Sequence, residues 1–72
     1  MVNVDRLRGA LAKQDVTVEQ AAAAIGVDRA TLYRRLAANG SRFTLDEVEK
    51  LSNLLNLSRQ EMERIFFDRE LA

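Results

Sequence analysis

A dense run of hydrogen-bond donors lies between Arg29 and Arg35. These seven residues, RATLYRR, contain three arginines, one threonine and one tyrosine. A guanidinium group donates in a fixed planar fork, which matches two acceptors on a guanine edge or two oxygens of an acid. Residues of these types at this spacing are therefore suited to binding an anionic partner or the edges of nucleic-acid bases.

The composition argues against an enzyme. The chain contains neither histidine nor cysteine, so it lacks the commonest general base, thiolate nucleophiles and thiolate metal ligands. It has no glycine-rich loop to cradle a phosphate, and its carboxylates fall near helix starts or on exposed helix faces without an inward-facing pair. We therefore expect no catalytic residues, no metal, no cofactor and no small-molecule ligand.

The charges are distributed unevenly, although the formal net charge of the chain is zero. Residues 1–43 carry a net charge of +3, and residues 44–72 carry −3. This asymmetry suggests one face for an anionic partner. Charges scattered over a small helical surface are the alternative, and the count alone does not separate the two.

Length and hydropathy indicate one small folded domain over residues 1–72, near the lower size limit for a self-sufficient core. Hydrophobic residues make up 47% of the chain, too many for a disordered one. No apolar run approaches the roughly 20 residues of a membrane span, and the start MVNVDRLRG lacks the apolar region of a signal peptide. We therefore expect a cytoplasmic protein without membrane association.

Helix start signals predict the elements that position the donors. Thr17, Thr44 and Ser58 are each followed three residues later by Gln or Glu, the pattern of a capping box. Asp28 is a fourth N-cap candidate. Each cap is bracketed by an apolar pair suited to a hydrophobic staple; the pairs are Val16/Ala21, Val27/Leu32, Phe43/Val48 and Leu57/Met62.

Apolar residues at helical spacing then predict an all-α, compact five-helix domain without strands. We expect helices over residues 4–14, 18–25, 29–38 and 45–55, and a fifth from residue 59. The predicted core consists of Val4, Leu7, Leu11, Val18, Ala21, Ala22, Ile25, Leu32, Leu36, Val48, Leu51, Leu55, Met62, Ile65 and Phe66.

Gly26 marks a tight turn between the second and third predicted helices. A glycine directly after Ile25 can adopt the left-handed conformation that ends a helix, and Asp28 restarts the chain two residues later. So short a connection makes the helices cross steeply, and the small Ala22 lets them approach. The pattern is typical of a helix-turn-helix over about residues 17–38.

The outward face of the predicted helix 29–38 fits the major groove of DNA. Arginine bonds guanine bidentately, and threonine and alanine methyl groups contact the thymine methyl. The start of the preceding helix would face a phosphate, because its amide donors and dipole favour an anion. The outward side chains are Arg29, Ala30, Thr31, Tyr33, Arg34 and the flank of Arg35; Thr17 and Gln20 lie at the phosphate-facing end.

The stretch TVEQAAAAIGVDRATLYRRLAANG, residues 17–40, resembles the helix-turn-helix of the lambda-repressor-like (Cro/cI, Xre) family. The small Ala22, the turn Gly26 and the surrounding apolar residues carry the resemblance. The five-helix order extends it over almost the whole chain, and the end FTLDEVEKLSNLLNLSRQEMERIFF is similar to short phage-encoded members. The sequence departs at Val18, where members often have a glutamine that holds a phosphate.

The resemblance implies a transcriptional regulator, a phage or prophage repressor or Cro-like protein that binds double-stranded palindromic operators as a homodimer. It implies base contacts by Arg29, Ala30 and Arg34, among which we include Thr31. The expected DNA-backbone contacts are Thr17, Gln20, Asp28, Tyr33, Arg35, Asn39, Ser41 and Arg42.

Several of these residues have a second interpretation. Thr17 and Asp28 are helix caps first, and Arg35 is equally suited to pairing with an acid. Phe67 and Leu71 are candidates for a dimer contact; alternatively, Phe67 folds back over a thin core. The acidic second half favours an alternative function, a protein-interaction module of the antirepressor or antitoxin kind.

Overall fold

The computed structural model describes residues 1–38 and 42–69 and contains five helices in this part of the chain, with no strand. They are α1 (Val4–Lys13), α2 (Val18–Ile25), α3 (Arg29–Ala37), α4 (Leu45–Leu54) and α5 (Arg59–Phe66). The predicted all-α fold is confirmed. Three predicted helix ends, at residues 14, 38 and 55, are one residue too long, and each of these residues is the C-cap.

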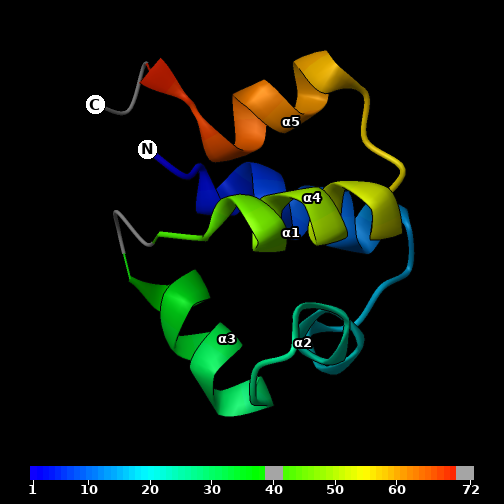
Figure 1. Ribbon diagram of the computed structural model, residues 1–72, viewed down its shortest axis with the longest axis vertical. Helices are drawn as coiled ribbons and strands as arrows, with labels where there is room; N and C mark the ends of the chain where they lie inside the picture. Colours follow the sequence, from blue (N-terminus) through cyan, green and yellow to red (C-terminus); the bar gives the residue numbers. More distant parts are fainter. Residues whose placement is uncertain (39–41, 70–72) are drawn as a thin grey trace.

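The helices form two groups around the core. In Figure 1, α4 and α1 overlap across the middle of the view, α5 lies on one side of them, and α2 and α3 lie together on the other. Direct contacts join α2 to α3 and α4, and α1 to α3 and α5. The helix-turn-helix therefore rests on α1 and α4, and the face of α3 opposite this support points outward.

Three of the predicted helix starts are confirmed in detail. The capping boxes Thr17/Gln20, Thr44/Glu47 and Ser58/Glu61 each form both reciprocal hydrogen bonds. Because these bonds connect residues three apart, the local sequence is sufficient to specify them.

Asp28 is the N-cap residue of α3, as predicted, but the capping hydrogen bond expected of its side chain is absent. The backbone of Asp28 is extended at this position. The third residue of α3 is Thr31, whose hydroxyl accepts a hydrogen bond from Arg34. No Glu or Gln is therefore available there to complete a box and lock the start of the helix.

The core follows the predicted apolar stripes, with Leu7, Leu32, Leu51 and Leu55 the most deeply buried side chains. Burying a leucine fully contributes about 1.5–3 kcal/mol, so these stripes are what hold α3 against the other helices. Val4, Val18 and Met62 from the predicted set are only partly buried.

The segment before α1 adds a buried residue that periodicity did not predict. The amide of Asn3 donates to the Ile65 carbonyl at 2.6 Å, and the amide of Asp68 donates to the Met1 carbonyl at 3.0 Å. This pairing places Val2 in the core. The Asn3 side chain also caps α1 by accepting from the amide of Arg6.

Gly26 ends α2 as predicted. Its φ of 78° and ψ of 30° are left-handed, and the next amide, of Val27, donates back to the Ala22 carbonyl at 3.0 Å. A Cβ at Gly26 would meet nothing within 4 Å. The backbone torsion, and not lack of space, therefore selects glycine here.

Candidate nucleic-acid interface

The outer face of α3 carries the residues that the sequence predicted there. Arg29, Ala30, Tyr33 and Arg34 are exposed and Thr31 is partly exposed, whereas Leu32 and Leu36 are buried beneath them. Because these two leucines lie four residues apart on the inner stripe, the opposite side of the helix, with Arg29, Ala30, Tyr33 and Arg34, faces solvent. The helix thus presents a continuous surface of donors and methyl groups.

Arg29, at the start of α3, forms an ion pair with Glu19 of α2. One guanidinium nitrogen lies 2.7 Å from the Glu19 Oε1, and both side chains are about two thirds exposed. The hydrogen bond to Glu19, aided by its negative charge, raises the pKa of Arg29 above its ordinary value. The two residues are ten positions apart, on different helices, so no short-range sequence signal predicted this pair.

Arg34, one turn after Thr31, has a neutral partner. Its Nη2 donates to the Thr31 hydroxyl oxygen at 3.2 Å. Within residues 1–38 and 42–69, no carboxylate forms an ion pair with Arg34. The full positive charge of Arg34 therefore faces outward, while that of Arg29 is partly neutralised by Glu19.

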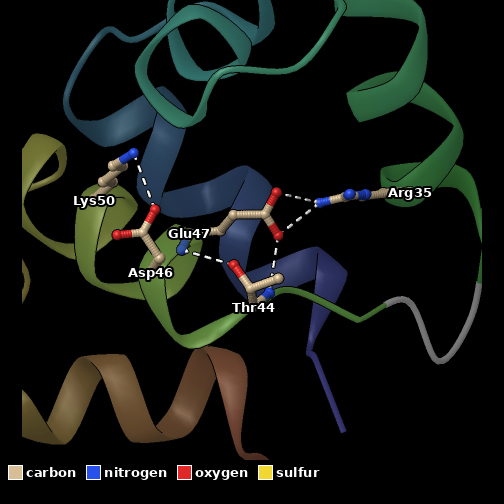
Figure 2. Close-up of polar contacts among 5 residues, drawn as sticks. All are labelled: Arg35, Thr44, Asp46, Glu47 and Lys50. Atoms are coloured by element: carbon tan, nitrogen blue, oxygen red, sulfur yellow. Dashed lines mark hydrogen bonds and ion pairs between the residues drawn. The ribbon is translucent and has the colours of Figure 1, made fainter.

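Arg35 points the other way and bonds to α4. Figure 2 shows one of its guanidinium nitrogens donating to both carboxylate oxygens of Glu47, at 2.9 and 3.0 Å. The same carboxylate accepts from the amide of Thr44 at 2.8 Å, and the amide of Glu47 donates to the Thr44 hydroxyl. The structure shows Arg35 paired with the carboxylate of Glu47. We therefore do not propose Arg35 as a DNA contact.

This network is also joined to the aromatic part of the core. The Arg35 guanidinium carbon lies 5.3 Å from the centre of the Phe43 ring. That ring meets Phe66 edge to face, with 5.7 Å between ring centres. Arg35 therefore connects α3 to the segment before α4 and, through Phe43, to α5.

Glu47 is a buried carboxylate that remains ionised at neutral pH. Burial raises its pKa, but hydrogen bonds from the Thr44 backbone and from Arg35, together with the positive charge of Arg35, outweigh this, and the net pKa is lowered. The sequence identified Glu47 as a capping residue but did not predict its burial or its partner Arg35.

At the start of α2, Thr17 and Gln20 satisfy each other and still retain donors. The Thr17 hydroxyl oxygen accepts from the Gln20 amide, and the Gln20 side-chain oxygen accepts from the Thr17 amide. Both residues are exposed. Because these bonds use only their acceptor oxygens, the Thr17 hydroxyl proton and the Gln20 side-chain NH₂ remain able to donate to an anion.

Four other positions were predicted to contact the DNA backbone, and they flank α3. Arg42 is exposed, whereas Asn39 and Ser41 lie outside the described residues. Asp28 is exposed and its carboxylate makes no capping hydrogen bond, so its negative charge would repel a phosphate. We therefore do not retain Asp28 as a DNA-backbone contact.

At the end of α5, an apolar patch of three side chains lies in a depression that is otherwise lined by polar and charged residues, which are Arg59, Gln60, Glu63, Arg64, Asp68 and Arg69. Phe67 is 46% exposed and Met1 is 50% exposed, and both line this shallow open depression together with Met62. Leu71, the other predicted dimer residue, lies outside the described part of the chain.

Comparison with known proteins agrees with this geometry. The family model described as helix-turn-helix, HTH_3, matches residues 7–62, and the chain therefore belongs to this Cro/cI-type, lambda-repressor-like family. Membership implies DNA binding and transcriptional regulation, and the family is not enzymatic. No curated protein and no solved structure gives a significant match.

Residues 1–38 and 42–69 contain neither a membrane span nor a metal-binding cluster. No helix there combines the length and apolar character needed to cross a bilayer. These residues contain no group of three or more acidic, histidine or cysteine side chains that could hold a metal ion.

Proposed function

We propose that this protein is a phage or prophage repressor, or a Cro-like regulator, that binds a palindromic operator as a homodimer with α3 in the major groove. The observation that carries the proposal is the outward surface of α3, where arginines and small side chains are exposed above a buried leucine stripe. A helix presented in this way by a tight turn fits the groove and reaches base edges.

Four residues of α3 are proposed to read bases. Arg29 and Arg34 would donate to the O6 and N7 of guanine, the commonest specific arginine contact. Ala30 and Thr31 would contact thymine methyl groups, and the Thr31 hydroxyl also keeps Arg34 oriented at 3.2 Å. The spacing of these residues along α3 lets them contact neighbouring base pairs.

Contacts to the DNA backbone are proposed on both sides of the groove. Thr17 and Gln20 would donate to a phosphate at the N-terminus of α2, where the helix dipole also favours negative charge. Tyr33 is 49% exposed on α3, and its hydroxyl would donate to a phosphate. Arg42, with Asn39 and Ser41, would contact the opposite strand.

The dimer is proposed to form through the apolar patch at Met1, Met62 and Phe67. Aromatic and methionine side chains with partial exposure at a helix end are typical of interface anchors. A palindromic operator requires a two-fold interface that leaves both α3 helices facing the same duplex.

The test is a genomic-fragment pull-down at moderate salt, followed by sequencing, with the Arg29→Ala/Arg34→Ala double variant in parallel. We expect one enriched palindrome that the double variant loses. The matched control is Arg8→Ala/Lys13→Ala, which removes the same charge from exposed positions of α1 and should keep the enrichment. If the double variant retains the enrichment, α3 does not read the DNA.

A protein partner is the second candidate function. Leu45 is 77% exposed at the start of α4, directly before the acidic Asp46 and Glu47. An exposed leucine beside acidic side chains suits a protein surface better than DNA. If no fragment is enriched over the double variant, the helix-turn-helix would be a scaffold for that interaction.

A further inference from the structure

The ion pair between Glu19 and Arg29 bears on how the α3 surface distinguishes one DNA sequence from another. Both side chains are about two thirds exposed, and they join the first turn of α2 to the first residue of α3 at 2.7 Å. An exposed pair of this kind adds little to folding stability. Its location on the proposed DNA-facing surface therefore matters more than its energy in the free protein.

We propose that Glu19 is a specificity-determining residue, which positions Arg29 for one base and penalises binding where that base is absent. This inference rests on the proposed DNA-binding function. It assigns to α2 a side chain that none of the base or phosphate contacts above includes.

The geometry allows Arg29 to hold Glu19 and a guanine together. Among described residues, the Arg29 side chain has one hydrogen-bond partner, reached by a single terminal nitrogen. A guanidinium has five N–H donors in a plane, so its other donors can meet a second acceptor pair. Because Glu19 restricts the rotation of this long side chain beforehand, less conformational freedom is lost when the guanine is bound.

Electrostatic repulsion between Glu19 and the DNA provides the penalty for binding where the preferred base is absent. On any duplex, the carboxylate of Glu19 approaches the phosphates that the start of α2 faces, and this repulsion opposes binding. Where Arg29 meets a guanine, the new hydrogen bonds offset the repulsion. Where it meets another base, Arg29 stays neutralised by Glu19 and the repulsion is not compensated, so binding to non-specific DNA is weakened most.

Arg34 provides the internal contrast. Its oriented partner is the neutral Thr31 hydroxyl at 3.2 Å, so it keeps its charge on every sequence. Arg34 should therefore attract any duplex, whereas Arg29 with Glu19 should contribute mainly on the right one.

The experiment measures dissociation constants of the full chain for two duplexes. The first is the consensus that the wild-type protein selects from a randomised double-stranded library, and the second is the same duplex with its sequence scrambled. The variant is Glu19→Gln, which keeps the size and removes the charge. The matched control is Glu49→Gln, the same charge change at an exposed position of α4 outside the helix-turn-helix.

We expect Glu19→Gln to bind the scrambled duplex about three- to tenfold more tightly, with a smaller gain on the consensus, so that the ratio of the two constants falls. Glu49→Gln should leave the ratio unchanged. In an Arg29→Ala background the additional effect of Glu19→Gln on base preference should vanish, because the positioned group is absent.

Three results would overturn the inference. One is an unchanged ratio in Glu19→Gln, and another is an equal shift in Glu49→Gln, which would assign the effect to net charge alone. The third is a change in the ratio of the two dissociation constants on Glu19→Gln that persists in the Arg29→Ala background. Failure of the proposed function would look different, because the wild-type chain would then select no sequence from the library, and the inference would fall with it.

Discussion

Two arginine–glutamate pairs connect α3 to the rest of the domain, and their surroundings differ. At the start of the helix, Arg29 and Glu19 are both exposed and joined by one hydrogen bond. In the second half of the helix, Arg35 donates to both carboxylate oxygens of the buried Glu47. Glu47 also completes the capping box of α4. The same two residue types therefore form an exposed pair at the start of α3 and a buried pair in its second half.

The difference teaches that burial, and not residue type, separates a structural arginine from a binding one. The Glu47 side chain is only 10% exposed, whereas that of Glu19 is 65% exposed. A buried carboxylate without its partner is strongly unfavourable, but an exposed one is readily solvated. We therefore expect the Arg35–Glu47 pair to control folding and the Arg29–Glu19 pair to control recognition.

The largest expected effect follows from removing the buried carboxylate. Glu47→Ala should lower the free energy of unfolding by about 2–4 kcal/mol, because it removes the carboxylate that Arg35 bonds and opens the capping box of α4. Urea denaturation followed by circular dichroism measures the change. Glu49→Ala, an exposed neighbour on the same helix, is the control and should stay within about 0.5 kcal/mol of the wild type. Equal stability of the two variants would show that the Arg35–Glu47 network does not hold α3.

Lowering the pH should also weaken the Arg35–Glu47 pair, with a smaller loss of folding stability than the Glu47→Ala substitution causes. Because the pKa of Glu47 is lower in the folded chain than in the unfolded one, its contribution is complete above the ordinary glutamate pKa of about 4.3. The contribution is lost as the pH falls from there through the lowered folded value. Urea midpoints measured between pH 7 and pH 3 should therefore fall less steeply for Glu47→Gln than for the wild type.

The pKa of Glu61 is also lowered, chiefly by the backbone hydrogen bond from Ser58, so some acid sensitivity should remain in Glu47→Gln. If the two proteins lose stability in parallel, Glu47 is not the group that titrates.

The smallest effect on stability is expected at the exposed pair. Glu19→Gln should move the thermal midpoint by no more than about 2 °C, because water replaces the lost partner of Arg29. Differential scanning calorimetry at low salt measures it under the conditions that favour the ion pair most. If Glu19→Gln lowered the thermal midpoint as much as Glu47→Ala does in the same measurement, the distinction between the two pairs would be removed.

The sequence predicted the parts of the fold that depend on neighbouring residues. Capping boxes connect positions three apart, and Gly26 is required by the torsion of a single residue. Asp28 shows the limit of this reasoning, because an N-cap residue type at the right position does not by itself form the hydrogen bond. The burial of Val2 depends on backbone pairing with the far end of the chain, which no periodicity records.

The candidate site was predicted less completely for the same reason. The leucine stripe specifies which side of α3 faces outward, so the exposure of Arg29, Ala30 and Arg34 was predictable. The partners were not, since Glu19 and Glu47 lie 10 and 12 residues from their arginines and meet them only in the folded chain. Which arginine is committed to the core and which to a partner is therefore a property of the tertiary structure.

The central claim is that Arg29 and Arg34 bind DNA while Arg35 holds the fold. The most direct measurement is a titration of ¹⁵N-labelled protein with its enriched duplex, in which the side-chain Nε–Hε signal of each arginine is followed by NMR. We predict large shifts for Arg29 and Arg34 and little change for Arg35. A shift of Arg35 that equals or exceeds theirs, or no shift at Arg29 and Arg34 on a duplex that does bind, would contradict the account.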